Sequence, residues 1–345
     1  MKLLIVTQKV DSTDPILGFF HRWIVEFAKH AEKVTVICLE EGIHQLPSNV
    51  SVYSLGKEKG NSKLQFIVRF YSLIFSLRND YDSVFVHMNQ IYVVLGGLLW
   101  RLWNKKILFW RNHAKGSFAT RIAAALSNRI FYTSPQSYTA RFSRSKRMPV
   151  GIDADFFSSD SVFLKRNSIL FLGRFSQVKN TQMFVDALTI LDEFALDFCA
   201  DIIGSAVTIQ DQKYEEDVKR SSSYLFEKKR IWFQSSISYE ATSDVYRKYW
   251  LYVNLTPDGS LDKTILEAMA SGIPVLILNS AFHGNIPEIC ELQRGDPSYI
   301  AERIKILLSL SGEERETLGN TLRQYVERHH SLKYLGNVIA QEVTV

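Results

Sequence analysis

Two basic side chains follow the apolar segment Ser168 to Leu172 at a spacing suited to binding phosphate. Gly173 comes first and permits close approach of a ligand to the backbone. Arg174 follows directly and Lys179 comes shortly after it. A guanidinium group can grip a diphosphate through two parallel hydrogen bonds, and an ammonium group adds a point charge. Because loop cations are more often merely solvated, this segment alone leaves both interpretations open.

A second segment, Thr256 to Pro274, joins a polar, glycine-containing loop to a short helical pattern. Backbone N–H groups at the start of that helix, near Lys263 and Thr264, are suited to hold a phosphate group. Glu267 lies one turn further on, where a carboxylate can accept hydrogen bonds from ribose hydroxyls. These residue types favour a nucleotide site, although a lone helical glutamate is more often an exposed surface acid.

The elements that position these residues alternate along the chain. Helical patterns such as Phe19 to His30 and Leu64 to Leu77 separate apolar, strand-like runs. Those runs are Leu3 to Val6, Val34 to Cys38, Val84 to Val86, Ile107 to Trp110, Ile130 to Tyr132, Ser168 to Leu172, Phe198 to Ile203, Ile231 to Phe233, Leu251 to Leu255 and Pro274 to Leu278. Such alternation predicts parallel sheets covered by helices, whose ligands bind beyond the carboxyl ends of the strands.

The length of 345 residues exceeds what one hydrophobic core usually supports, so two domains are expected. The predicted fold is α/β, with two doubly wound Rossmann-like domains, residues 1–150 and 165–330, facing across a cleft. The join is placed in the polar stretch between Pro149 and Arg166. The C-terminal segment 331–345 has a short amphipathic pattern, and we expect it to pack back on the first domain.

Together these segments resemble the retaining family-four glycosyltransferases, two-domain enzymes of the GT-B type that use nucleotide sugars. The resemblance covers nearly the whole chain and is strongest from Gly151 onward. Each motif is weak alone, but their order and spacing are specific. The motifs are Gly151-Ile152-Asp153 with Phe156 or Phe157, Gly173-Arg174-Phe175 with Lys179, Ile203-Gly204, and Leu266-Glu267-Ala268-Met269-Ala270 with Gly272 and Pro274.

The resemblance implies that Arg174 and Lys179 stabilise the diphosphate leaving group and that Glu267 binds the ribose. No metal ion or other cofactor is therefore expected. Further donor-binding residues are implied at matching positions, namely Gly173, Gly204, Lys263 and Thr264.

Two positions depart from the family pattern. The family has a second acid eight residues before Glu267, in contact with the donor sugar, and this chain has Gly259 there. Asp258 and Asp262 are the candidate replacements. The base-binding loop, Phe-x-Gly in the family, here ends in Ser235.

In the first domain, Gly18 resembles the glycine of the loop that borders the acceptor and the diphosphate. His21 follows it and is taken as an acceptor-side residue. His113, after the strand-like run Ile107 to Trp110, matches the histidine that lines the cleft near the donor sugar and is taken as catalytic. A lone histidine is as often structural, and His87, which also follows a strand, is a weaker candidate for the cleft.

The expected function is retaining transfer of a sugar from a nucleotide sugar to a glycan or lipid-linked acceptor, in polysaccharide or glycoconjugate synthesis. An oxocarbenium-like transition state needs cations where charge grows on the β-phosphate, and no carboxylate nucleophile. One alternative is a nucleotide-sugar epimerase or hydrolase, whose acid and base residues are not evident. Another is a degenerate, binding-only subunit, which Gly259 and Ser235 favour.

Charge is distributed unevenly. Residues 1–150 hold 21 Lys and Arg against 9 Asp and Glu, and the remaining residues hold 20 against 27. No acid lies between Ser83 and Ile152, where eleven basic residues lie. With the apolar runs Leu64 to Leu77 and Ile91 to Trp103, this predicts docking of the first domain on an anionic membrane, unless both runs are core helices. Nucleic-acid binding ranks last, because the aromatics lie within apolar runs.

The N-terminus lacks the pattern of a signal peptide, and the apolar run from Ile91 to Trp100 is shorter than the ~20 residues of a spanning helix. The three cysteines are widely spaced and odd in number. A cytoplasmic location is expected, with peripheral attachment at the inner membrane face.

Overall fold

The computed structural model describes residues 1–157, 166–259 and 261–344. Part of the predicted join, residues 158–165, and Ser260 of the polar loop lie outside this description. The chain divides into two compact units. Unit 1 is Met1–Gly151 together with the C-terminal helix α12 (Leu332–Thr344), and unit 2 is Ile152–Ser331.

Unit 1 is built on a seven-stranded parallel sheet with strand order β3-β2-β1-β4-β5-β6-β7. All five strand-like runs predicted in this half are strands. Two further strands, β3 and β7, were not predicted, because β3 mixes apolar and polar residues without a continuous apolar run and β7 has no apolar residue. The strands are β1 (Lys2–Val10), β2 (Lys33–Glu41), β3 (Val50–Ser54), β4 (Ser83–His87), β5 (Lys106–Trp110), β6 (Arg129–Tyr132) and β7 (Ser145–Arg147).

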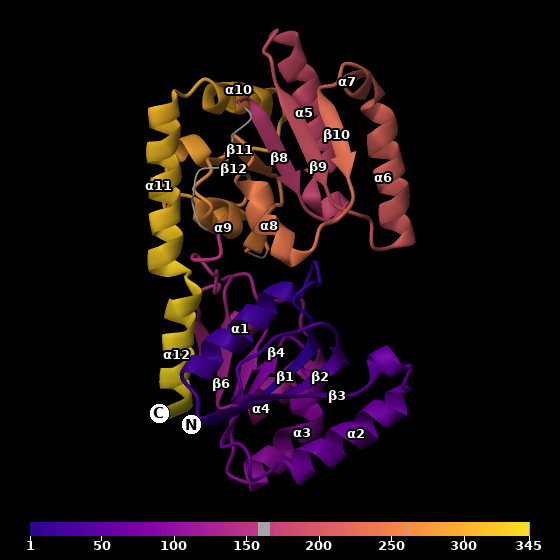
Figure 1. Cartoon of the computed structure of the whole chain (residues 1–345), viewed down its shortest axis with the longest axis vertical. Coiled ribbons are helices and arrows are strands. Elements are labelled where there is room, and N and C mark those ends of the chain that lie inside the picture. The colour runs from indigo at the N-terminus through magenta and orange to yellow at the C-terminus, as the bar shows by residue number, and fades with distance from the viewer. Residues whose placement is uncertain (158–165, 260, 345) are drawn as a thin grey trace. The chain divides into compact units, whose positions relative to one another are not determined.

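Helices cover both faces of this sheet (Figure 1). The C-terminal helix α12 packs on α1, where Gly336 lies so close to α1 that a Cβ atom there would stand 2.9 Å from Glu26. Glu342 of α12 also pairs with Arg129 at 3.2 Å and with Lys146 at 2.8 Å. The helices of unit 1 besides α12 are α1 (Gly18–Lys29), η1 (Lys57–Lys59), α2 (Lys63–Ser76), α3 (Ile91–Leu102), α4 (Phe118–Leu126) and η2 (Tyr138–Arg141).

Unit 2 repeats the architecture with a five-stranded parallel sheet of order β10-β9-β8-β11-β12. Each strand overlaps one of the predicted runs, with ends that differ by at most one residue. Strand β8 is buried along its whole length, as its uninterrupted apolar sequence predicts for a parallel strand covered on both faces. The strands are β8 (Ser168–Leu172), β9 (Cys199–Ile203), β10 (Ile231–Gln234), β11 (Leu251–Asn254) and β12 (Val275–Ile277).

The core of unit 2 includes apolar side chains of α5 and α10, among them Phe184, Leu188, Ile300 and Ile304, packed with the sheet. Figure 1 shows these two helices side by side. In both units the strand order reverses beside the first strand, so the prediction of doubly wound α/β domains is confirmed. The helices of unit 2 are η3 (Gln177–Lys179), α5 (Thr181–Glu193), α6 (Ile209–Ser221), α7 (Ser223–Glu227), α8 (Tyr239–Tyr246), α9 (Lys263–Ala270), η4 (Ser280–Phe282), η5 (Glu288–Cys290), α10 (Pro297–Leu308) and α11 (Gly312–His329).

Among the helices of the described residues, none has the length and apolar character needed to cross a bilayer.

Candidate functional site

Lys179 lies at the switch point of the unit 2 sheet, between the neighbouring strands β8 and β11. A single turn, η3, follows β8 and ends at Lys179. Its ammonium group forms an ion pair with the carboxylate of Asp262 and donates a hydrogen bond to Oγ1 of Thr256 at 3.3 Å. Both charged side chains are mostly buried, with 15% and 12% of their surface exposed. The loops after β8 and β11 are therefore joined by a buried charge pair.

Asp262 is the N-cap of helix α9. Its Oδ1 accepts a hydrogen bond from the backbone N–H of Thr264 at 3.4 Å, and its Oδ2 accepts one from Nδ2 of Asn254 at 3.0 Å. Burial would raise the pKa of Asp262, but the charge and hydrogen bond of Lys179 outweigh it and bring the pKa down to about 2. Asp262 is therefore ionised at neutral pH, with Lys179 as its counter-ion.

The buried pair of Lys179 and Asp262 predicts that the folded protein loses stability in acid. The folded-state pKa of Asp262, about 2, lies below its ordinary value of 3.8, so the stabilisation is complete above pH ~4 and is lost as the pH falls through 2. We expect Asp262→Asn, which leaves the buried Lys179 without its counter-ion, to lower the free energy of unfolding at pH 7 by about 3–5 kcal/mol and to flatten its decline between pH 4 and pH 2.

Urea denaturation at pH 7, 4 and 3 measures this effect. Asp217→Asn is the matched control, because Asp217 pairs with Arg220 on the surface and such pairs contribute little. If both variants shifted the midpoint equally, the buried pair would not be the source of the effect.

Tyr252 joins Asn254 and Thr256 at the end of β11 in a buried network that sequence reasoning missed. The hydroxyl of Tyr252 donates to Oγ1 of Thr264 at 2.7 Å, and Nδ2 of Asn254 donates to the Tyr252 hydroxyl at 2.9 Å. Oγ1 of Thr256 also lies 3.2 Å from Oδ2 of Asp262. The one signal in the sequence was the polar Asn254 at the end of an otherwise apolar strand.

Glu267 lies on the buried face of α9 and is only 5% exposed. Its Oε2 accepts a hydrogen bond from the hydroxyl of Tyr246, the last residue of α8, at 3.1 Å. Burial raises the pKa of Glu267 to about 7, and it raises the pKa of the Tyr246 phenol well above its ordinary range. The alternative of an exposed surface acid is thus wrong for Glu267, whose carboxyl group is buried beside the Tyr246 hydroxyl.

Lys263 lies one turn before Glu267 on the same helix. Burial lowers the pKa of its ammonium group to about 8, with Glu267 acting in the opposite direction. The pKa values of two side chains four residues apart, Lys263 and Glu267, are thus both shifted toward 7. Shifted pKa values of this kind are common at functional sites.

Two of the glycines predicted in unit 2, Gly173 and Gly204, are in close contact through their backbones. Gly204 follows β9, and a Cβ atom there would lie 1.9 Å from the carbonyl oxygen of Gly173, so only glycine fits. Arg174, next to Gly173, is exposed. The backbone beyond β8 and β9 is therefore closely packed, with an exposed guanidinium beside it.

Three further predicted residues of unit 2 are Asp258, Gly259 and Ser235. Asp258 accepts two hydrogen bonds from Ser280, from its backbone N–H and its hydroxyl, both at 2.7 Å. Gly259 has a φ of +138°, which an L-residue rarely adopts. Ser235 is exposed beyond the end of β10. Of the two candidate acids, Asp262 therefore meets a predicted cation, whereas Asp258 is bound to Ser280.

In unit 1, His113 is exposed in the loop after β5 and its Nδ1 accepts the backbone N–H of Lys115 at 3.0 Å. Buried Arg111 supports this loop by donating to the carbonyl oxygens of His113 at 3.3 Å and Lys115 at 2.8 Å. Gly18 begins α1, and Nε2 of His21 lies 2.9 Å from the carbonyl oxygen of Gln45.

The weaker candidate His87 is a core residue, 2% exposed and stacked on Phe20 with ring centroids 3.9 Å apart.

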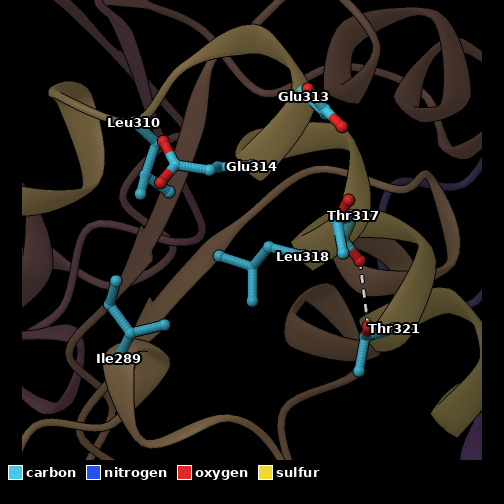
Figure 2. Close-up of a pocket in the computed structure, with 7 residues that line it drawn as sticks. All are labelled: Ile289, Leu310, Glu313, Glu314, Thr317, Leu318 and Thr321. Atoms are coloured by element: carbon cyan, nitrogen blue, oxygen red, sulfur yellow. Dashed lines mark hydrogen bonds between the residues drawn. The ribbon is translucent and has the colours of Figure 1, made fainter.

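Two pockets lie in unit 2. Figure 2 shows one of about 400 Å³ lined by Ile289 and by α11 residues that include Glu313 and Leu318. None of the predicted site residues lines it. The other, of about 340 Å³, is lined by Gln177 and Asn180, which flank Lys179 in the chain, and by Tyr214. None of the predicted site residues lines this second pocket either.

A family model described as glycosyl transferases group 1 matches residues 153–325, half of this chain. The chain belongs to the glycosyl transferases of group 1. The match includes the network of Lys179, Asp262 and Glu267. No curated protein matches the chain.

Solved structures match over essentially the whole length. HepE from Anabaena, in complex with UDP, has a TM-score of 0.77 at 16% identity, covering 100% of both chains. Sucrose-phosphate synthase from Thermosynechococcus elongatus has a TM-score of 0.78 at 14% identity, covering 100% of this chain and 98% of the other. A UDP-forming trehalose-phosphate synthase from Burkholderia xenovorans has a TM-score of 0.73 at 12% identity, covering 100% and 99%. At these identities the likeness shows the fold, and the predicted GT-B fold is confirmed.

Proposed function

We propose that this glycosyltransferase moves a sugar from a nucleoside diphosphate sugar to an acceptor hydroxyl, with retention of configuration and without a metal ion. The observation that carries the proposal is Lys179, whose ammonium group lies beyond β8 and β11, paired with the residue that caps α9. Cations and helix N-termini at such a place favour phosphate. UDP is the diphosphate expected first, because HepE was solved with UDP and with UDP-glucose.

In the proposed reaction, the bond between the anomeric carbon and the β-phosphate oxygen breaks, and its electron pair stays on that oxygen. The acceptor oxygen attacks the anomeric carbon from the same face, and its proton passes to the leaving phosphate. The products are a glycosylated acceptor and a nucleoside diphosphate. Negative charge grows on the β-phosphate, where Arg174, Lys179 and the N–H groups of α9 would stabilise it.

Binding the diphosphate would change the partner of Lys179. The charge of Lys179 is balanced by Asp262, which Asn254 and Thr256 also hold in place. A diphosphate that approached Lys179 would share this cation with Asp262, so the carboxylate fixes the position of the ammonium group before the donor arrives. Such preorganisation lowers the cost of reaching the transition state.

The acceptor proposed is a glycan or a lipid-linked saccharide on the side of Gly18, His21 and His113, within cell-surface polysaccharide or glycoconjugate synthesis in the cytoplasm. The support is the resemblance of these unit 1 positions to the acceptor side of family-four enzymes.

Donor hydrolysis tests the function directly. The purified chain is incubated with UDP-, GDP- and ADP-sugars, and the released nucleoside diphosphate is measured. We expect turnover with one nucleotide series. Tight binding of a donor without release would instead favour a binding-only subunit, for which Gly259 in place of the family's acid is the motivating observation. Epimerised donor without release would favour an epimerase.

Metal independence is a separate expectation. Lys179 and Arg174 supply the positive charge that a divalent ion would otherwise bring to the diphosphate, so the ion would duplicate their role. Transfer should proceed at the same rate in excess EDTA as in magnesium or manganese. Activity that EDTA abolishes and a divalent ion restores would contradict this assignment of the site.

A further inference from the structure

Helix α2 of unit 1 is apolar on two opposite faces. Phe70 and Ile74 are buried against the sheet. Leu64, Val68 and Phe75 point outward and are 70%, 62% and 45% exposed. Their spacing places them along one line of the helix, far from the buried face. A surface helix normally carries polar residues there, so this face is suited to a contact outside the chain.

Helix α3 has the same design. Tyr92, Val93 and Trp100 are buried. Leu98 and Leu102, four residues apart on its outward side, are 65% and 77% exposed. The predicted alternative, that both apolar runs are core helices, is therefore right for one face of each helix and wrong for the other.

The two outward faces adjoin. The hydroxyl of Tyr71 on α2 donates to the carbonyl oxygen of Leu95 on α3 at 3.0 Å, and the rings of Phe75 and Trp103 pack edge to face at 5.1 Å. Figure 1 shows the helices next to each other. The outward residues form one surface, here called the α2–α3 surface. Its members are Leu64, Val68, Phe75, Leu98 and Leu102.

The charged residues of helices α2 and α3 are all basic. Lys63 begins α2, Arg78 lies two residues beyond the end of α2, and Arg101 lies in the last turn of α3; all three are exposed. Residues 59–79 and 83–152 contain no acid. The nearest acids in sequence are engaged within unit 1: Glu58 accepts the hydroxyl of Ser54 at 2.8 Å, and Asp80 pairs with Lys33 at 3.1 Å.

We propose that the α2–α3 surface binds an anionic lipid bilayer, with the leucines and Phe75 entering the interface and the cations meeting lipid phosphates. Basic residues beside an anionic membrane each strengthen binding roughly fivefold. Apolar side chains add the gain of leaving water. A second copy of the chain would bring the same cations face to face, which disfavours it as the occupant. The proposal concerns where the enzyme is held and is independent of the donor chemistry.

Vesicle flotation at low salt tests the proposal. The native chain should float with vesicles of phosphatidylglycerol and phosphatidylcholine and stay behind with phosphatidylcholine alone. Leu98→Gln with Leu102→Gln should weaken binding by about tenfold or more, since two exposed leucines leave the interface. Lys63→Gln with Arg78→Gln should weaken vesicle binding by a similar factor. Raising the salt concentration should also weaken the binding of the native chain.

The matched control replaces two exposed aliphatic residues of unit 2, Ile209→Gln with Ile306→Gln, and should float like the native chain. Donor hydrolysis without vesicles should be unchanged in the leucine variant, which shows that it is folded and separates this proposal from the proposed function. Equal recovery on neutral and anionic vesicles, or flotation of the leucine variant like the control, overturns the proposal. So does a native dimer in light scattering that the leucine variant loses, which would assign the surface to a second copy.

Discussion

Replacement of Arg174 or Lys179 by alanine is expected to lower the turnover of sugar transfer by about 10²-fold to 10³-fold. This is the usual effect of removing a preorganised group that meets charge developing in a transition state. Arg174 is exposed, so Arg174→Ala should melt like the parent. Arg220→Ala, which removes an exposed cation of α6, is the matched control and should retain parental turnover.

Lys179 needs a second variant, because its removal leaves the carboxylate of Asp262 buried without its counter-ion. Breaking one side of a buried pair typically costs about 3–5 kcal/mol. Lys179→Met combined with Asp262→Asn removes both charges and should recover most of this stability without recovering turnover. If this double variant, well folded, transferred sugar at nearly the parental rate, Lys179 would have no part in stabilising the leaving group.

Glu267→Gln is expected to have opposite effects on donor binding and on stability. Loss of a charge-assisted hydrogen bond to the ribose should weaken donor binding by ~1.5–3 kcal/mol, or roughly 10-fold to 100-fold. Stability should increase at pH 8, because the carboxylate of Glu267 is buried and its pKa is raised from 4.5 to about 7. Glutamine keeps an acceptor for the Tyr246 hydroxyl and does not ionise.

The free energy of unfolding of the parent should fall as the pH rises from about 4.5 toward 8. Below pH ~4.5 Glu267 is protonated in both folded and unfolded chains, and as the pH rises to 7 the unfolded chain releases its proton first, so the parent loses stability. The loss is on the order of 1–3 kcal/mol by pH 8, and Glu267→Gln should not show it.

Thermal melting and calorimetric titration of UDP at pH 6 and pH 8 measure both effects. Glu216→Gln, at an exposed position of α6, is the control. A variant that bound donor like the parent would place the ribose contact elsewhere.

The sequence by itself determined the fold class and most of the strands. Parallel strands buried on both faces need nearly continuous apolar runs, and such runs can be recognised in the sequence, as in Ser168 to Leu172 and Leu251 to Leu255. The edge strands β3 and β7 were not predicted, because β3 mixes apolar and polar residues and β7 has no apolar residue. The sequence also placed Lys179 shortly after the β8 run and Glu267 on the helix that follows the β11 run.

Only the tertiary structure decided the state of these residues. Lys179 and Asp262 are 83 residues apart, and the sheet order that sets β8 beside β11 brings their charges together. Whether Glu267 faces water or core depends on how α9 rotates against α8, which places Tyr246 against it. The exposed apolar faces of α2 and α3 could likewise not be told from buried ones in the sequence, because the type of an apolar residue does not say whether its side chain packs inward or points outward. Burial, and with it pKa and charge pairing, is a property of neighbours that the chain meets only when folded.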